Sequence, residues 1–333
     1  MTTFQTSIAL LLYHLTLVPA TSLPVLSQAL STNNSLPAIL IPTNPTAPTP
    51  PPGFSVRLNF NSSVQLRPLE VYIYTMGLLT TLCFSPWTST ITHSLVMSGS
   101  DASTEVVLNP LRPFDDSTLE VRHGVLGLYK AGVAIAQGGR FTKLDAPLYV
   151  RDLQVGSLQV QPRSTLSSTT NNTNNNNNQP QPPTNPTPPS SNDPATLTTD
   201  SGTITDPTDP NFTLTYHYDG VRIKAQDIFT AFLDALATAA EHGNGDPAAH
   251  IPAARSAGGD TVLSTWTVGP GAAMTWQRLK RALCLVWTAL VTGRRARFEG
   301  LAFGVVYQGV GIGGGRLLRF DGGGGGVDGD GDG

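Results

Sequence analysis

The sequence predicts an α+β protein made of two tandem modules of about one hundred residues each. When the chain is compared with itself at an offset of 157 residues, positions 64–144 give twelve identities in eighty-one pairs, where chance gives roughly five. Each copy also alternates between the period of a strand and the period of a helix. Low-complexity segments lie before, between and after the copies, so the offset divides the chain into modules.

Most of the matched positions fall on apolar residues, threonines and one Arg-Phe pair. They include Val64 with Val221, Leu79 with Leu236, Thr81 with Thr238, Thr118 with Thr275, and Arg140-Phe141 with Arg297-Phe298. The expected organisation is a signal peptide (1–20), a Pro/Thr-rich disordered segment (21–53), the first module (54–160), a disordered Asn/Pro/Thr-rich linker (161–210), the second module (211–320) and a flexible Gly/Asp-rich tail (321–333).

The first module begins with an alternating strand at 55–60 and a helix at 69–83, followed by an extended region at 92–109. Ser117 and Glu120 have the spacing of a capping box, in which two side chains satisfy free amides of the first helical turn. A helix is therefore expected to open there and to end at Gly138-Gly139, before a last strand or hairpin over 141–160.

The second module repeats this order of strands and helices. The expected elements are a strand at 212–216, a helix at 225–241, a strand at 260–266, a helix at 276–292 and a strand at 298–308. Each module is thus β-α-β(β)-α-β. The simplest closed arrangement is a ferredoxin-like plait, a split βαβ in which two helices cover one face of a small sheet.

The N-terminus predicts secretion. An apolar run at 8–18 is followed by Pro19-Ala20, and this run is too short to span a bilayer. Four Asn-X-Ser/Thr sequons fit an extracellular, glycosylated protein, and glycans would solubilise a chain with only 13% charged residues. Those sequons are at Asn33, Asn61, Asn171 and Asn211. No membrane span is expected, because no second apolar segment of sufficient length follows.

The two cysteines, Cys83 and Cys284, are not at equivalent positions in the repeat. In an oxidising compartment they could form one bridge between the modules; the alternative is two separate, buried thiols. The segment Gly309–Gly314 matches a dinucleotide fingerprint, but no helix is expected after it to receive a pyrophosphate. A flexible hairpin turn is the better interpretation, and no cofactor is expected.

Few polar residues indicate chemistry. His93 and His250 occupy the same repeat position, yet neither has a second ligand or a nucleophile nearby in the sequence. Asp115 and Asp116 could act as an acid and base pair, but they directly precede a helix start, where the helix dipole favours anions. The end of the second module is basic, either as a polyanion site or as the solvated end of a helix. Its cations are Arg278, Lys280, Arg281, Arg294, Arg295 and Arg297.

The preferred hypothesis is a secreted, glycosylated, non-catalytic protein that binds an extracellular protein, or a polysaccharide of a cell wall or matrix. One alternative is a secreted hydrolase in the first module, using His93 or His123 with Asp101, Asp115 or Asp116. Another is a binder of acidic glycans or membrane surfaces through the basic end of the second module. Nucleic acid is not expected as a partner, because the net charge is −3 and no aromatic-basic pattern accompanies the arginines. The modules could also pair with each other.

Overall fold

Each half of the chain forms an antiparallel sheet with two helices on one face. We describe residues 48–111, 118–163, 200–248, 253–268, 274–291 and 296–320 of a computed structural model. The first half contains β1 (Phe54–Val56), β2 (Asn59–Gln65), α3 (Pro68–Cys83), β3 (Leu95–Met97), β4 (Thr104–Pro110), α4 (Val121–Gly138), β5 (Thr142–Val150) and β6 (Leu153–Pro162).

The second half has the same sequence of elements. It contains β7 (Ser201–Asp206), β8 (Asp209–Arg222), α5 (Ala225–Ala240), β9 (Ala254–Arg255), β10 (Thr261–Thr267), α6 (Trp276–Val291), β11 (Glu299–Tyr307) and β12 (Val310–Arg319). The structure thus confirms a mixed α and β fold with two antiparallel sheets and, within the described residues, four helices. The signal segment, most of the Pro/Thr-rich segment and linker, and the Gly/Asp tail lie outside the described residues.

The two halves match in detail at the spacing of 157 residues. Adding 157 to the bounds of α3, β4, β5 and β6 gives those of α5, β10, β11 and β12. The bulge after Leu148 in β5 recurs after Val305 in β11. The hairpin turns also correspond, because Arg151-Asp152 and Gln308-Gly309 all have positive φ, as the tight turns of twisted hairpins require. The self-similarity of the sequence therefore has a structural counterpart.

The expected ferredoxin-like plait is wrong. That plait places its first strand between the third and fourth strands, whereas here the first sheet has the order β1-β5-β6-β4-β3, with β2 beside β5 at the edge. The central position belongs to β6, the second arm of a hairpin. The second sheet, ordered β7-β8-β11-β12-β10-β9, has β12 in the equivalent place. In each half, the second strand of the hairpin that follows the last helix therefore takes the place that the first strand has in a ferredoxin-like plait.

Other local predictions also differ from the structure. β7 and the start of β8 lie inside the segment predicted as linker, so the second half begins no later than Ser201. The Gly309–Gly314 segment is a turn only at Gln308-Gly309, and the glycines after it belong to β12. The capping box at Ser117 and Glu120 is misplaced, because Glu120 is itself the N-cap of α4 and its reciprocal partner is His123. Ser117 lies outside the described residues.

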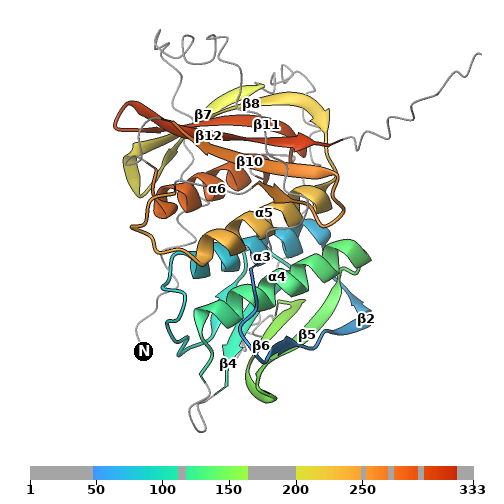
Figure 1. Ribbon diagram of the computed structural model, residues 1–333. Coiled ribbons are helices and arrows are strands. Elements are labelled where there is room, and N and C mark those ends of the chain that lie inside the picture. Colours follow the sequence, from blue (N-terminus) through green and yellow to red (C-terminus); the bar gives the residue numbers. More distant parts are fainter. Residues whose placement is uncertain are drawn as a thin grey trace, which may run out of the picture.

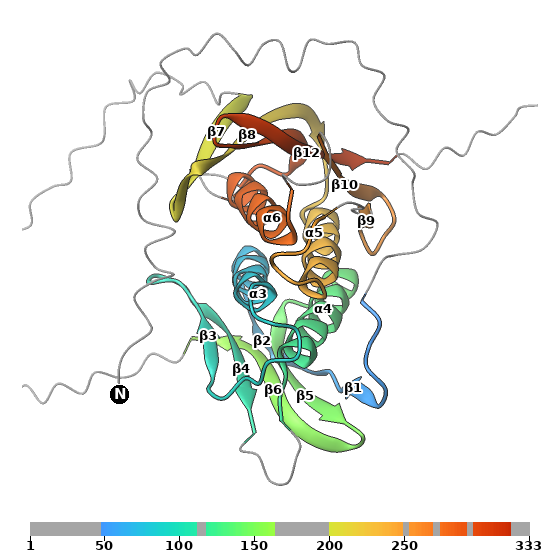
Figure 2. The ribbon, with the colours of Figure 1, turned by 60° about the vertical axis from the view of Figure 1, so that its left-hand side comes forward.

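The helices of the two halves pack on each other between the two sheets, as Figures 1 and 2 show from two directions. Tyr72 of α3 stacks on Phe229 of α5 with ring centroids 4.3 Å apart. Gly132 of α4 has no side chain, and a Cβ there would come within 2.5 Å of Leu233 of α5. This close approach lets α4 and α5 share one core, and the buried residues of both halves form a single cluster. The halves are therefore packed together, not independent bodies on a linker.

Candidate functional site

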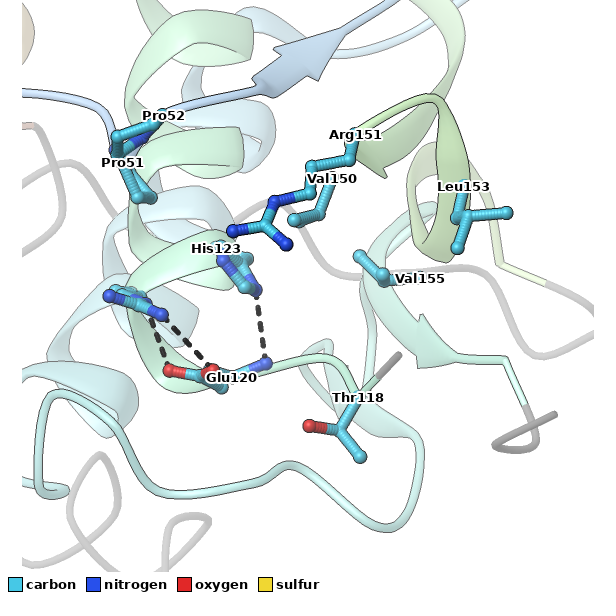
Figure 3. Close-up of a pocket in the computed structure, with 10 residues that line it drawn as sticks. Pro51, Pro52, Thr118, Glu120, His123, Val150, Arg151, Leu153 and Val155 are labelled. Atoms are coloured by element: carbon cyan, nitrogen blue, oxygen red, sulfur yellow. Dashed lines mark hydrogen bonds and ion pairs between the residues drawn. The ribbon is translucent and has the colours of Figure 1, made fainter. Parts of the chain in front are cut away.

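A cavity of about 390 Å³ lies at the N-terminus of α4, in the first half of the protein (Figure 3). It is bounded by the chain before β1, by the start of α4 and by the β5–β6 hairpin. The lining residues are Pro51, Pro52, Thr118, Glu120, Arg122, His123, Val150, Arg151, Leu153 and Val155. Cavities that combine apolar walls with a few polar groups are the usual places for small ligands.

His123 is the buried polar residue of this cavity, with a residue exposure of only 2%. Its Nδ1 accepts a hydrogen bond from the Glu120 backbone N–H at 3.3 Å, and its ring stacks on Phe54 with centroids 5.4 Å apart. Arg122 forms an ion pair with Glu120 at 2.8 Å. Burial lowers the pKa of His123 against the opposing effect of Glu120. The imidazole is therefore neutral at physiological pH.

This arrangement favours binding over proton transfer. Because Nδ1 accepts the Glu120 N–H, the neutral ring carries its proton on Nε2, which has no hydrogen-bond partner among the described residues. Nε2 can therefore donate to an oxygen atom, whereas the basic nitrogen is occupied by the helix cap. Apart from Thr118, no described lining residue offers a hydroxyl or thiol nucleophile. Among the described lining residues, the hydroxyl of Thr118 is therefore not accompanied by a free imidazole nitrogen that could act as a base, because His123 Nδ1 accepts the Glu120 N–H.

The capping role of His123 predicts how stability depends on pH. Its pKa is lowered by burial from an ordinary value of 6.5. As the pH falls below 6.5 the unfolded chain binds a proton before the folded chain does, so the free energy of unfolding decreases. We expect His123→Gln, whose amide oxygen can still accept the N-cap N–H, to have a shallower acid dependence in urea unfolding between pH 7 and 5. A residual slope is expected from His242, whose pKa is also lowered by burial. Parallel curves for the two proteins would contradict this role.

The other catalytic candidates are not brought together among the described residues. His93 is exposed, and its recorded side-chain contact is a hydrogen bond of 3.3 Å with its neighbour Thr92. Asp101 is exposed in a turn. Asp115, Asp116 and His250 lie outside the described residues. The structure thus gives no support to catalysis by His93.

The predicted basic patch is divided by the fold. Lys280 is buried and donates to the His242 carbonyl and Asn244 Oδ1, both at 2.9 Å. Arg281 forms ion pairs with Asp206 at 3.6 Å and Asp209 at 3.2 Å.

Two further cations of the predicted patch also have local partners. Arg297 forms ion pairs with Asp200 and Glu299. Arg278 lies over the Tyr307 ring, 3.9 Å from its centroid. Arg294 and Arg295 lie outside the described residues. The described cations serve mainly to stabilise the second half.

Two sequons lie on exposed strand positions. Asn61 of β2 and Asn211 of β8 are both exposed, and the Oδ1 of Asn61 accepts hydrogen bonds from the backbone N–H (3.1 Å) and the hydroxyl (2.7 Å) of Ser63. Both asparagines are therefore sterically accessible for glycosylation. Asn33 and Asn171 lie outside the described residues.

The outer face of the second sheet contains an aromatic residue that the sequence alone did not single out. Trp266 of β10 is partly exposed, and its indole covers Gly314 of β12, where an added Cβ would come within 3.2 Å of the ring. Gly315, the next residue, faces inward against Phe303, and successive residues of a strand face opposite sides. The Trp266 ring therefore lies on the outer face, away from the helices. It can pack over Gly314 because glycine has no side chain.

Cross-strand pairing extends this surface into a row. Trp266 pairs with Gly314, Gly314 with Gly304, Gly304 with Thr215, and Thr215 with Thr203. Four strand spacings correspond to about 19 Å. The neighbouring row consists of Ser264, Arg316, Ala302, His217 and Ser201. The hydroxyl of Ser264 is buried, so this row offers the side chains of Arg316, His217 and Ser201 to a ligand. We call these two rows the Trp266 face.

Neither known protein-family models nor curated proteins match this sequence. The fold and the side chains must therefore carry the functional argument. None of the described helices is long and apolar enough to cross a membrane. Within the described ranges, no three His, Cys, Asp or Glu side chains are grouped so that they could hold a metal ion.

Proposed function

We propose that the protein is a secreted, glycosylated, non-catalytic binding protein and that the Trp266 face binds a neutral polysaccharide. The observation that carries the proposal is the indole of Trp266 lying over Gly314 at one end of a row of small and hydroxyl-bearing residues. Sugar rings have apolar C–H faces that pack on an indole, and their hydroxyl groups exchange hydrogen bonds with threonine and serine side chains. A polymer suits a row about 19 Å long.

The composition of the row supports an extended ligand. Beside the Trp266 indole, which covers Gly314, Gly304 leaves the middle of the row without a side chain that would block a chain of sugars. Thr203 and Thr215 then supply hydroxyl groups at the end opposite Trp266. His217 and Arg316 on the neighbouring row can donate hydrogen bonds to ring or hydroxyl oxygens. The carboxylate of Asp219 lies beyond these rows, on the same outer side of β8.

The proposal is tested by retention on insoluble chitin and β-glucan. We expect the wild-type protein to bind at least one of them, and Trp266→Ala to bind roughly tenfold more weakly, since loss of one stacking aromatic removes about 1–2 kcal/mol. Trp87→Ala is the matched control, because Trp87 is a partly exposed tryptophan of the first half. It should bind as the wild type does.

Other outcomes would reject the proposal. Absence of wild-type binding to both polymers, or equal losses in Trp266→Ala and Trp87→Ala, would contradict a sugar site on the Trp266 face. Retention on heparin that is lost at moderate salt would instead favour an acidic glycan, because attraction between exposed charges is screened by salt. The assay should include Asn211→Gln, so that a glycan at Asn211 does not mask the face.

A further inference from the structure

The two cysteines, which lie 201 positions apart in the sequence, meet where the halves pack together. Cys83 is the last residue of α3, and Cys284 lies in the middle of α6. Both sulfurs contact Thr80: Cys83 Sγ is 3.2 Å from its carbonyl oxygen, and Cys284 Sγ is 3.5 Å from its hydroxyl oxygen. The two thiol groups are also close enough to shift each other's pKa.

The surroundings of the two thiols differ. Cys83 is fully buried, and burial raises its pKa well above the ordinary value. Cys284 is partly exposed. The hydrogen bond from the Cys83 thiol, followed by that from the Thr80 hydroxyl, lowers the pKa of Cys284 against the opposing effect of burial. Because the thiolate is the reactive form, Cys284 is the more exposed and more reactive thiol of the pair, and Cys83 is the buried second thiol.

We propose that Cys83 and Cys284 form a reactive thiol pair, which a low-molecular-weight disulfide such as oxidised glutathione converts into a covalent bond between the two halves. In the first step the Cys284 thiolate attacks one sulfur of the oxidant, and the other sulfur leaves as glutathione thiolate. In the second step the Cys83 thiolate attacks Cys284 Sγ and displaces the second glutathione.

The net reaction is balanced. Two protein thiols are oxidised to one disulfide, one glutathione disulfide is reduced to two glutathione molecules, and the two thiol protons pass to them. The new bond fixes the end of α3 to α6. A crosslink between such distant positions restricts the unfolded chain strongly, so it should stabilise the folded state. In an oxidising compartment the halves would be joined covalently, whereas in a reducing one only packing would hold them.

The experiment treats the reduced, full-length protein and single-cysteine variants with oxidised glutathione. In the wild type, alkylated after denaturation, we expect neither thiol to react, together with a mass loss of two hydrogens, no glutathione adduct and a monomer on non-reducing gels. A non-reduced digest should contain the Cys83 peptide joined to the Cys284 peptide. The thermal midpoint should rise by about 5–10 °C on oxidation and return on reduction.

The variants test the order of the two steps. Cys83→Ala should accumulate one stable glutathione adduct on Cys284, because no second thiol can displace it. Cys284→Ser should leave Cys83 unmodified in the folded state, since that thiol is buried. A stable adduct or a disulfide-linked dimer in the wild type would overturn the proposal. So would equally fast modification of the two variants, or two thiols that stay alkylatable in the fully oxidant-treated wild type.

Discussion

Phe229→Ala is expected to lower the free energy of unfolding by about 3–5 kcal/mol, the usual cost of removing a buried aromatic side chain. Phe229 of α5 is fully buried where the four helices meet. Its ring stacks on Tyr72 of α3 and lies 6.2 Å from the Trp287 ring of α6. It also packs against the backbone of Gly132 in α4, where an added Cβ would come within 3.2 Å of the ring. The cavity left by alanine would therefore remove contacts between the halves as well as within the second half.

Chemical unfolding followed by tryptophan fluorescence and by circular dichroism measures this effect. The control is Phe320→Ala, because Phe320 is 40% exposed at the end of the second sheet and its removal should change stability by less than about 1 kcal/mol. We also expect the two probes to separate in Phe229→Ala, since weakened packing between the halves breaks the single cooperative transition. A loss no larger than that of the control would show that the helix layers are not tightly packed.

The local periodicity of the sequence predicted most of the helices and strands, but it could not predict how the strands pair. α3, α5 and α6 carry apolar residues at helical spacing, and their predicted bounds lie within about two residues of those in the structure. The ferredoxin-like topology failed because strand order depends on long-range pairing. β12 was missed because Gly311 and Gly313–Gly315 have low strand propensity. Three of these glycines fit closely under larger side chains, Gly313 under Met274, Gly314 under Trp266 and Gly315 under Phe303.

The sites were less predictable than the fold. The Cys83–Cys284 pair could be suggested from the expected secretion and the cysteine count, whereas the common contact of both sulfurs with Thr80 depends on the packing of α3 against α6. Trp266 belongs to an alternating strand, and only the register opposite Gly314 places its ring on the outer face. Lys280 was assigned to an exposed basic patch, because nothing in its helix indicates that Asn244 and the His242 carbonyl cover it. Sequence periodicity places residues on elements, but burial is decided by distant segments.

Lys280→Ala is expected to lower the free energy of unfolding by about 1–3 kcal/mol, because it removes a buried ammonium group that donates two charge-assisted hydrogen bonds. Lys280 is only 1% exposed, and its Nζ donates to Asn244 Oδ1 and the His242 carbonyl. Asn244 in turn donates to the Phe84 carbonyl of the first half at 2.9 Å. The lysine therefore holds the residue that links the end of α3 to the second half. Lys224→Ala is the control, since that side chain is 70% exposed and should contribute less than about 0.5 kcal/mol.

The pH dependence gives a second test of the buried ammonium group. Burial lowers the pKa of Lys280 from its ordinary value of 10.5, against the opposing effects of Cys83 and Asp246. As the pH rises towards 10.5 the folded protein releases this proton before the unfolded chain does, so the cost of burying the charge is relieved and stability rises. We expect the stability difference between wild type and Lys280→Ala to increase with pH in this range. A difference that stays constant would mean that Lys280 titrates as a solvated lysine, and its ammonium group would then not be the buried link between the halves.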